Sequence, residues 1–170
     1  MGPAHPPDPF ASQYVVPDER DVGTASGQFR AVAGGLVALG RAGAEVGAQG
    51  TLELMASAYL GVRASLEWTA LRPTGEPMLL AGKLGPSLHL LPYRPVDLSF
   101  FFEAGVAGVD LTGRATAMPI VTPGAALEVW LTGWAFLRAE GHVDWGIYGT
   151  PDATHGYLRF VAVGGPGLAI

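Results

Sequence analysis

The stretch "YLGVRASLEWTAL", Tyr59 to Leu71, places an arginine and a glutamate four residues apart in a run of otherwise apolar and small residues. On a helix, Arg63 and Glu67 would share one face, but the apolar residues at every even position from 60 to 70 would be scattered around the cylinder. On a strand, all of these even positions form one apolar face, and the odd positions hold Gly, Arg, Ser, Glu and Thr. The stretch therefore predicts a β-strand with one apolar face and one polar face.

The composition indicates one domain that is short of charge. The chain has 170 residues, of which 49% are hydrophobic and 15% are charged, against about 25% charged residues in ordinary soluble domains. No uncharged apolar run approaches the roughly 18 to 20 residues of a membrane-spanning helix. The absence of cysteine excludes disulfides and thiolate metal sites. A net charge of -5 without a basic patch argues against nucleic acid as a partner.

Two regions of the chain differ in pattern. Residues 1–26 carry five prolines among mixed polar residues without periodicity, which is typical of an extended tail or linker. Residues 27–170 contain eight segments of strand character, separated by Gly, Pro, Thr and Asp clusters, and no apolar stripe of helical period. We place these strands near residues 28–39, 44–55, 58–71, 78–91, 96–109, 121–131, 135–148 and 157–170.

The charges of each predicted strand fall on one face. In the clearest segment, Arg138, Glu140, His142 and Asp144 alternate with apolar or small residues. Thirteen charges in the eight strands all lie opposite the apolar residues of their own strand. With two histidines of the same face, this polar set comprises Arg30, Glu45, Glu53, Arg63, Glu67, Lys83, His89, Asp97, Glu103, Glu128, Arg138, Glu140, His142, Asp144 and Arg159.

The residue composition of the polar faces is typical of a narrow barrel interior rather than of a surface exposed to water. A soluble barrel or sandwich, such as one that binds a hydrophobic ligand, would turn its apolar face inward and its charges to water. The polar faces of soluble strands are dense in Lys, Glu and Thr, whereas here one or two charges per strand are diluted by Gly, Ala and Ser. Small residues suit the inside of a narrow barrel, where each charge needs an opposite partner.

Segment length and number agree with a barrel that crosses a membrane. The segments run roughly 10 to 14 residues, and a tilted membrane strand needs about 9 to 11. An even number of strands closed into a ring satisfies every backbone amide in lipid. The joins at Ser57, at 93–95 and at 132–134 are tight, and we expect longer loops at 72–77, 110–119 and 149–156. The prediction is an all-β, eight-stranded antiparallel up-and-down transmembrane β-barrel with an extended N-terminal tail.

Outward-facing aromatic residues are expected in two belts at the membrane interfaces. One belt, near the rim with long loops, comprises Trp68, Trp145 and Phe160. The other, near the rim with short turns, comprises Phe29, Phe100, Tyr93 and Trp134.

At the C-terminal end, Gly165 is followed three and five positions later by Leu168 and Ile170. This spacing, with the eight-strand pattern over residues 27–170, resembles the eight-stranded outer-membrane barrels of Gram-negative bacteria, of the OmpA-membrane-domain and OmpX type. The resemblance implies that Gly165, Leu168 and Ile170 form an assembly signal, although Ile170 replaces the usual terminal aromatic residue. It also implies a location in the bacterial outer membrane, with a signal peptide removed before residue 1 and residues 1–26 in the periplasm.

Three prolines fall inside predicted strands, at Pro86, Pro123 and Pro166. Each lacks the amide donor of the ladder and has a glycine neighbour. We therefore expect bulges or bends there, and an overcounted strand is the alternative.

The polar set offers little sign of catalysis. The group around His142 suits a proton relay or a divalent-ion site, but a structural ion-pair network explains it more simply. Ser87 and His89 would suit a membrane lipid hydrolase if the pair faced lipid, whereas both are expected on the inward face.

The sequence therefore predicts no enzyme activity, no catalytic residue, no metal and no cofactor. The function predicted is a structural, anchoring or adhesive role, with an interior filled by charged side chains. The expected partners are outer-membrane lipid and an envelope or periplasmic protein that contacts the loops or the tail.

Overall fold

The computed structural model describes residues 27–40, 43–71, 76–92, 95–111, 114–150 and 153–170. Within these ranges no helix is long and apolar enough to cross a membrane. The described chain forms eight strands, which are β1 (Phe29–Gly40), β2 (Gly43–Met55), β3 (Leu60–Leu71), β4 (Glu76–His89), β5 (Val96–Leu111), β6 (Arg114–Trp130), β7 (Ala135–Thr150) and β8 (Ala153–Ala169).

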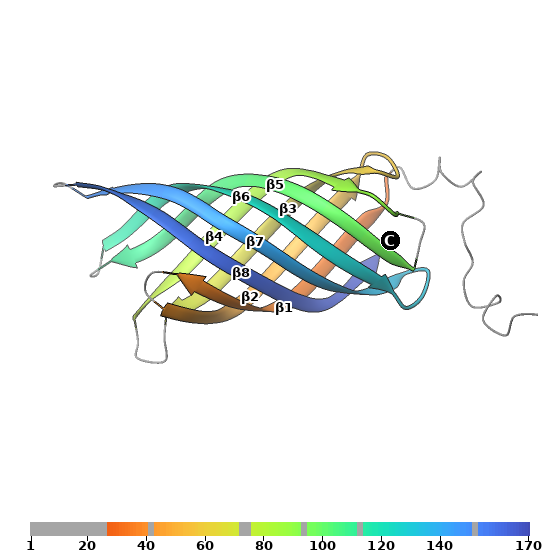
Figure 1. Ribbon diagram of the computed structural model, residues 1–170, viewed down its shortest axis with the longest axis horizontal. Helices are drawn as coiled ribbons and strands as arrows, with labels where there is room; N and C mark the ends of the chain where they lie inside the picture. Colours follow the sequence, from red (N-terminus) through yellow and green to blue (C-terminus); the bar gives the residue numbers. More distant parts are fainter. Residues whose placement is uncertain (1–26, 41–42, 72–75, 93–94, 112–113, 151–152) are drawn as a thin grey trace, which may run out of the picture.

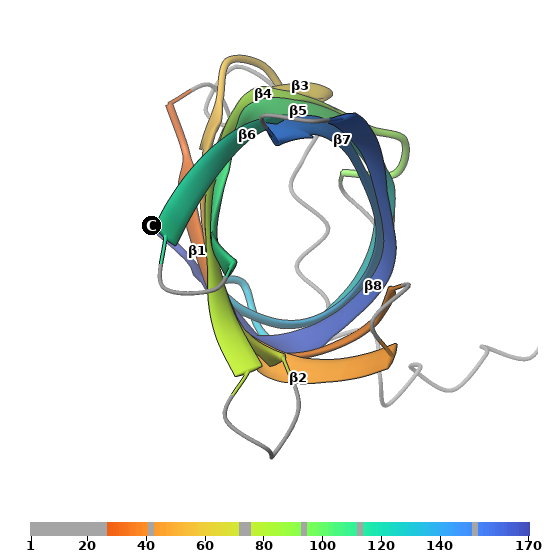
Figure 2. The ribbon, with the colours of Figure 1, turned by 90° about the vertical axis from the view of Figure 1, so that its left-hand side faces the viewer.

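The eight strands close into a barrel. Each strand pairs antiparallel with the next along the chain, and β8 returns to pair with β1 (Figures 1 and 2). Closure leaves no edge strand with unpaired amides. The prediction of an eight-stranded up-and-down barrel is confirmed, and the alternative of an overcounted strand is wrong.

The barrel is inside-out relative to a soluble protein. Leu66 and Phe102 point outward, with 59% and 51% of their surface exposed, whereas Arg63 and Glu103 are fully buried inside. Every charged side chain that the structure describes in the strands is buried. Because apolar residues cover the outside, the alternative of a soluble barrel with an apolar interior is wrong. Such an exterior is stable only when hydrocarbon replaces water around it.

One rim carries short turns and both ends of the described chain. Ser57 and Thr132 act alike in two of these turns, because each hydroxyl oxygen accepts hydrogen bonds from backbone amides two and three residues later. At the same rim, the amide of Gly27 donates to the carbonyl of Met55, and Ile170 pairs with Phe29. The predicted tail, residues 1–26, lies outside the described residues.

The opposite rim differs from the prediction. Loops were expected over 110–119 and 149–156, but the strand ladder continues to Leu111 with Arg114 and to Thr150 with Ala153. β6 therefore begins seven residues before its predicted start near residue 121. The apolar alternation that located the strands ends where the lipid would end, but backbone pairing needs no such alternation and continues beyond it.

The strand prolines cause neither a bulge nor a register shift. The register of β4 against β5 is the same before and after Pro86, although the pairs at Gly85 and Pro86 are missing on that side. Pairing is interrupted in the same way beside Pro123 toward β7 and beside Pro166 toward β1. Each proline thus turns its donor-free side to one neighbour while the ladder to the other neighbour continues. The only register shift recorded in the described ladders lies between Ala70 and Leu71.

Candidate functional site

The candidate site is the barrel interior. The structure buries all fifteen residues of the predicted polar set, each with no more than 6% of its surface exposed. They come from all eight strands, so strand closure alone brings together residues that are far apart in the sequence.

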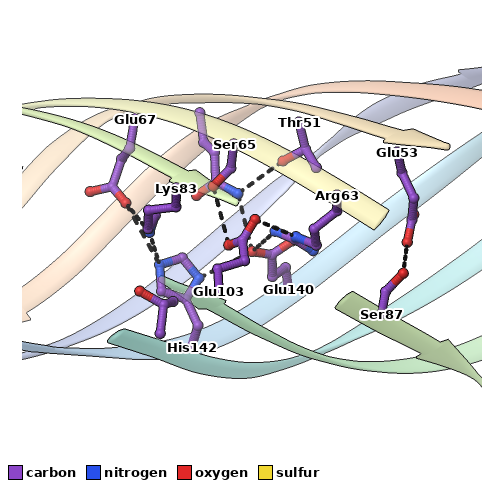
Figure 3. Close-up of polar contacts among 12 residues, drawn as sticks. Thr51, Glu53, Arg63, Ser65, Glu67, Lys83, Ser87, Glu103, Glu140 and His142 are labelled. Carbon is purple, nitrogen blue, oxygen red and sulfur yellow. Dashed lines mark hydrogen bonds and ion pairs between the residues drawn. The ribbon is translucent and has the colours of Figure 1, made fainter. Parts of the chain in front are cut away.

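Arg63 points into the interior and contacts two acids of other strands, Glu103 and Glu140 (Figure 3). Its Nε donates to Glu103 at 2.9 Å, and its Nη2 donates to Glu140 at 2.8 Å. The guanidinium carbon lies 3.7 Å from the centre of the Phe101 ring, within cation–π range. Ser65 donates a further hydrogen bond to Glu103 at 3.1 Å. One cation from β3 therefore forms ion pairs with carboxylates from β5 and β7.

A second group of ion pairs lies toward the rim with the extended hairpins. The Lys83 ammonium donates to Glu67 at 3.0 Å and to Asp144 at 3.1 Å. Arg159 binds the same two carboxylates and also donates to Glu45 at 3.0 Å. Three acids and two bases from β2, β3, β4, β7 and β8 are thus joined in one network.

A third group lies toward the rim with short turns. Arg30 donates to Glu128 at 2.9 Å and lies 3.6 Å from Asp97. His89 Nδ1 lies 2.6 Å from Asp97, and Nε2 lies 3.0 Å from Glu53. The ring of His89 therefore bridges two carboxylates from different strands.

Arg138 joins the third group to the centre. Its Nη1 donates to Glu128 at 3.0 Å and lies 3.5 Å from Glu53, and its Nε lies 3.2 Å from Glu140. Breaking one partner of a buried pair costs roughly 3 to 5 kcal/mol, because the other charge stays buried without compensation. The network therefore holds the strands in one register.

Apolar clusters occupy the remaining interior. These clusters are Leu79, Ala81, Ala107, Met118 and Ile120; Leu36, Ala38, Val161 and Val163; and Val32, Phe136 and Ala169. Buried charged groups and buried apolar side chains therefore both line the described lumen.

Two groups of residues have the ligand types of a metal site. Their ligand atoms lie within 4.8 Å of one another, and the groups are Glu67, His142 and Asp144, and His89, Asp97 and Glu128. In the first group, Lys83 and Arg159 already bind the carboxylates, and in the second Arg30 does. A metal ion would have to share each group with a cation of the chain, so neither group fits a metal site.

Ser87 and His89 are not arranged as a nucleophile and its base. Both side chains contact Glu53: Ser87 donates to it, and His89 Nε2 lies 3.0 Å from it. Both face the lumen, with 3% and 0% of their surface exposed.

The aromatic residues predicted for the belts lie on the outside wherever the structure describes them. Trp68, Trp145 and Phe160 are 46%, 55% and 58% exposed. Phe29, Phe100 and Trp134 are 41%, 47% and 61% exposed. Tyr93 lies outside the described residues.

The residues of the predicted assembly signal lie on the last strand and just after it. Leu168 is 47% exposed and Ile170 is 88% exposed, so both face outward. A Cβ on Gly165 would fall on the carbonyl of Ala33, so this glycine allows β8 and β1 to approach closely.

Several interior residues that contact the polar set were not predicted as site residues. Gln49, Ser65 and Thr122 donate to Glu140, Glu103 and Asp144. Thr51 accepts a hydrogen bond from Gln49, Thr69 accepts one from Arg159, and the ring of Phe101 lies against Arg63. Strand parity would have found Phe101, because it shares the face of Asp97 and Glu103. Its position in the apolar run 100–102 concealed that parity.

Comparison with known proteins gives structural relatives only. No family model matches the sequence, and no curated protein sequence matches it. Neisserial surface protein A is similar, with a TM-score of 0.57, 14% identity and coverage of 83% of this chain and 95% of that one. Ail of Yersinia pestis has a TM-score of 0.56 and 14% identity, with 85% and 99% covered. OprG of Pseudomonas aeruginosa has a TM-score of 0.56 and 9% identity, with 85% and 96% covered. The chain has the fold of the small eight-stranded outer-membrane barrels.

Proposed function

We propose that this protein is a sealed outer-membrane barrel that serves as an anchor, with a structural or adhesive role rather than a catalytic one. The observation that carries the proposal is the combination of an apolar exterior with a lumen filled by ion pairs. At eight strands, a barrel has just enough width for side chains, so solutes have no free path.

In this proposal, the two rims of the barrel are where the anchor contacts its partners. The hairpins β5–β6 and β7–β8 extend the ladder at one rim, and the chain enters at the other rim, where Gly27 binds Met55. In barrels of this fold the short turns face the periplasm. Residues 1–26 would then begin on the periplasmic side, where they are available to tether an envelope protein.

Conductance tests the sealed lumen. Purified protein inserted into a planar bilayer in potassium chloride should show no ion conductance above that of the bare bilayer. The matched positive control is Arg63→Ala combined with Glu103→Ala, which removes both side chains of a buried ion pair from the lumen. Steady wild-type channels would contradict the proposal.

Labelling tests the orientation. Because the chain has no cysteine, Ala11→Cys introduces a unique thiol in the tail. In intact cells an impermeant maleimide should leave it unlabelled, and permeabilising the outer membrane should allow labelling. The control is Thr112→Cys, in the join between β5 and β6, which should be labelled in intact cells. The reverse pattern would show that the tail faces outward.

A further inference from the structure

The three interior groups form a file of ionisable side chains along the barrel, interrupted at one place. At one end, His89 bridges Asp97 and Glu53 through its two ring nitrogens, at 2.6 and 3.0 Å. Toward the other end, His142 Nδ1 lies 3.1 Å from Glu140, and its Nε2 lies 3.3 Å from the ammonium of Lys83. His89 thus has an acceptor on both nitrogens, which is the arrangement required to take up a proton on one and release it from the other. His142 has an acceptor at Nδ1, whereas the Lys83 ammonium beside Nε2 is a donor, and the carboxylates of Glu67 and Asp144 lie 3.7 and 3.8 Å from Nε2.

The groups around both rings come from several strands. His89 is faced by Glu53 of β2, Asp97 of β5 and Arg30 of β1. His142 faces another set, composed of Lys83 of β4, Glu67 of β3, and Glu140 and Asp144 of β7, with the Phe101 ring at its edge.

Among the described residues the file has one gap, between Glu53 and Glu140, and the Arg138 guanidinium lies within ion-pair distance of both. Five buried polar atoms of the described residues around this gap have no hydrogen-bond partner: Gln49 Oε1, Glu53 Oε2, Arg63 Nη1, and Arg138 Nε and Nη2. Two of them still form ion pairs, because Glu53 Oε2 lies 3.5 Å from Arg138 Nη1 and Arg138 Nε lies 3.2 Å from Glu140. All four side chains are at least nine-tenths buried.

These unmatched atoms have the chemistry of a water site. Three of them are donors and two are acceptors. A bound ion would need partners of one kind, whereas water both donates and accepts. Buried polar groups normally find a partner, and the cost of leaving one unmatched is about 1 to 3 kcal/mol. Water at the gap would connect Glu53 with Glu140 and complete the file.

The charge of the interior favours an additional proton. Eight carboxylates face five Lys and Arg side chains in the described lumen. This excess of negative charge attracts cations and repels anions. An eight-stranded barrel has just enough width for side chains and excludes hydrated ions, so a proton that moves along hydrogen bonds is the cation that this lumen can pass.

We propose that the file is a proton relay through an otherwise sealed barrel. A proton moves from a carboxyl group or water to one nitrogen of His89 or His142, and the other nitrogen gives its proton to the next carboxylate or water. Only N–H and O–H bonds form and break, and each ring returns to its starting charge. Rotation of the ring restores the starting tautomer. This relay rests on the proposed membrane barrel and extends it.

Proton flux into liposomes tests the relay. The full chain is reconstituted into phosphatidylcholine vesicles that contain a trapped pH dye, with potassium and valinomycin to hold the membrane potential at zero. After an external acid step, wild-type vesicles should acidify several-fold faster than protein-free vesicles. His89→Gln and His142→Gln keep hydrogen-bonding groups of similar size without titrating, and each should return the rate to that of protein-free vesicles. Val143→Ala, which changes the outward neighbour of His142, should keep the wild-type rate.

A trapped chloride-sensitive dye in parallel vesicles separates the possible failures. Wild-type vesicles that acidify no faster than protein-free ones, while remaining impermeable to chloride, overturn the relay and leave the sealed barrel intact. Rapid chloride entry overturns the sealed barrel, and with it the relay. If wild-type flux is high but both histidine variants retain it, the path does not run through the histidines, and the relay is equally overturned. If a histidine variant fails to insert, the proton flux of wild-type vesicles compared with protein-free vesicles still tests the relay.

Discussion

Arg63 and Glu67 lie four residues apart on β3 and face the same lumen, yet each forms its ion pairs with other strands. Arg63 binds Glu103 and Glu140, and Glu67 binds Lys83 and Arg159. The polar face of this strand therefore connects it to β4, β5, β7 and β8 at two heights in the barrel. The two charges act as separate cross-links that fix the strand within the ring.

Removing the Arg63 charge should destabilise the barrel strongly. Arg63→Met leaves Glu103 and Glu140 without their shared cation, and the expected loss is about 3 to 5 kcal/mol in the free energy of unfolding. Urea unfolding in lipid vesicles, followed by tryptophan fluorescence, measures it. The control is Val62→Ala on the outward face of the same strand, where 50% of the valine is exposed. Equal losses for the two variants would mean that the central ion pairs contribute little.

An arginine on the outer face should be costly only if that face meets lipid. Leu84 lies near the middle of β4 and is 59% exposed. Leu84→Arg should lower the free energy of unfolding in vesicles by about 2 to 4 kcal/mol, the cost of a charge near the bilayer midplane. Leu84→Ala controls for the lost leucine. On a water-facing strand the arginine would change stability by only about 0.5 kcal/mol, and that result would exclude lipid contact at this position.

Two glycines on β4 should respond in opposite ways to the same added methyl group. A Cβ on Gly85 would fall on the backbone carbonyl of Phe102, so Gly85→Ala forces β4 and β5 apart beside Pro86. The expected loss is roughly 1 to 3 kcal/mol. Gly82 faces open space on the outside, with nothing within 4 Å of its Cβ, so Gly82→Ala should be neutral or stabilising by up to about 1 kcal/mol. Unfolding midpoints in the same vesicles compare the two, and a Gly85→Ala barrel as stable as wild type would refute the close approach.

The hydroxyl of Thr132 should stabilise the β6–β7 turn. It accepts hydrogen bonds from the amides of Trp134 and Ala135, at 3.3 and 3.0 Å. Thr132→Val removes the acceptor at nearly constant shape and should cost about 0.5 to 1.5 kcal/mol. Thr132→Ser retains the acceptor and should preserve the stability, so a serine variant as unstable as the valine variant would argue against the hydrogen bonds.

The sequence was sufficient to predict the strands and their faces, because a period of two residues is read directly from the chain. It was insufficient for their ends: Arg114 to Ile120 shows no clean alternation of apolar and charged residues, yet it pairs fully with β5. The bulges predicted at the prolines are absent, because the missing donor interrupts the ladder to one neighbour only and the ladder to the other neighbour continues. Barrel closure lets a strand tolerate that loss.

The polar set was predictable from parity, but the ion pairs were not. Which acid pairs with Arg63, whether Glu103, Glu140 or another, depends on the stagger between strands on opposite sides of the lumen. The sequence of a single strand does not determine that stagger. Glu53 illustrates the point, since it contacts Ser87, His89 and Arg138 from β4 and β7.

Quenching of tryptophan fluorescence by brominated lipid tests the inside-out arrangement most directly. Trp145 is 55% exposed on the outside, whereas Trp130 packs against Phe136 and its ring lies 5.2 Å from the Arg30 guanidinium, on the lumen side. Two single-tryptophan variants, with the other tryptophans changed to phenylalanine, are folded into vesicles whose acyl chains carry bromine. The Trp145 variant should be strongly quenched, and the Trp130 variant should be quenched far less. Stronger quenching of Trp130 than of Trp145 would contradict a barrel with hydrocarbon outside and ion pairs within.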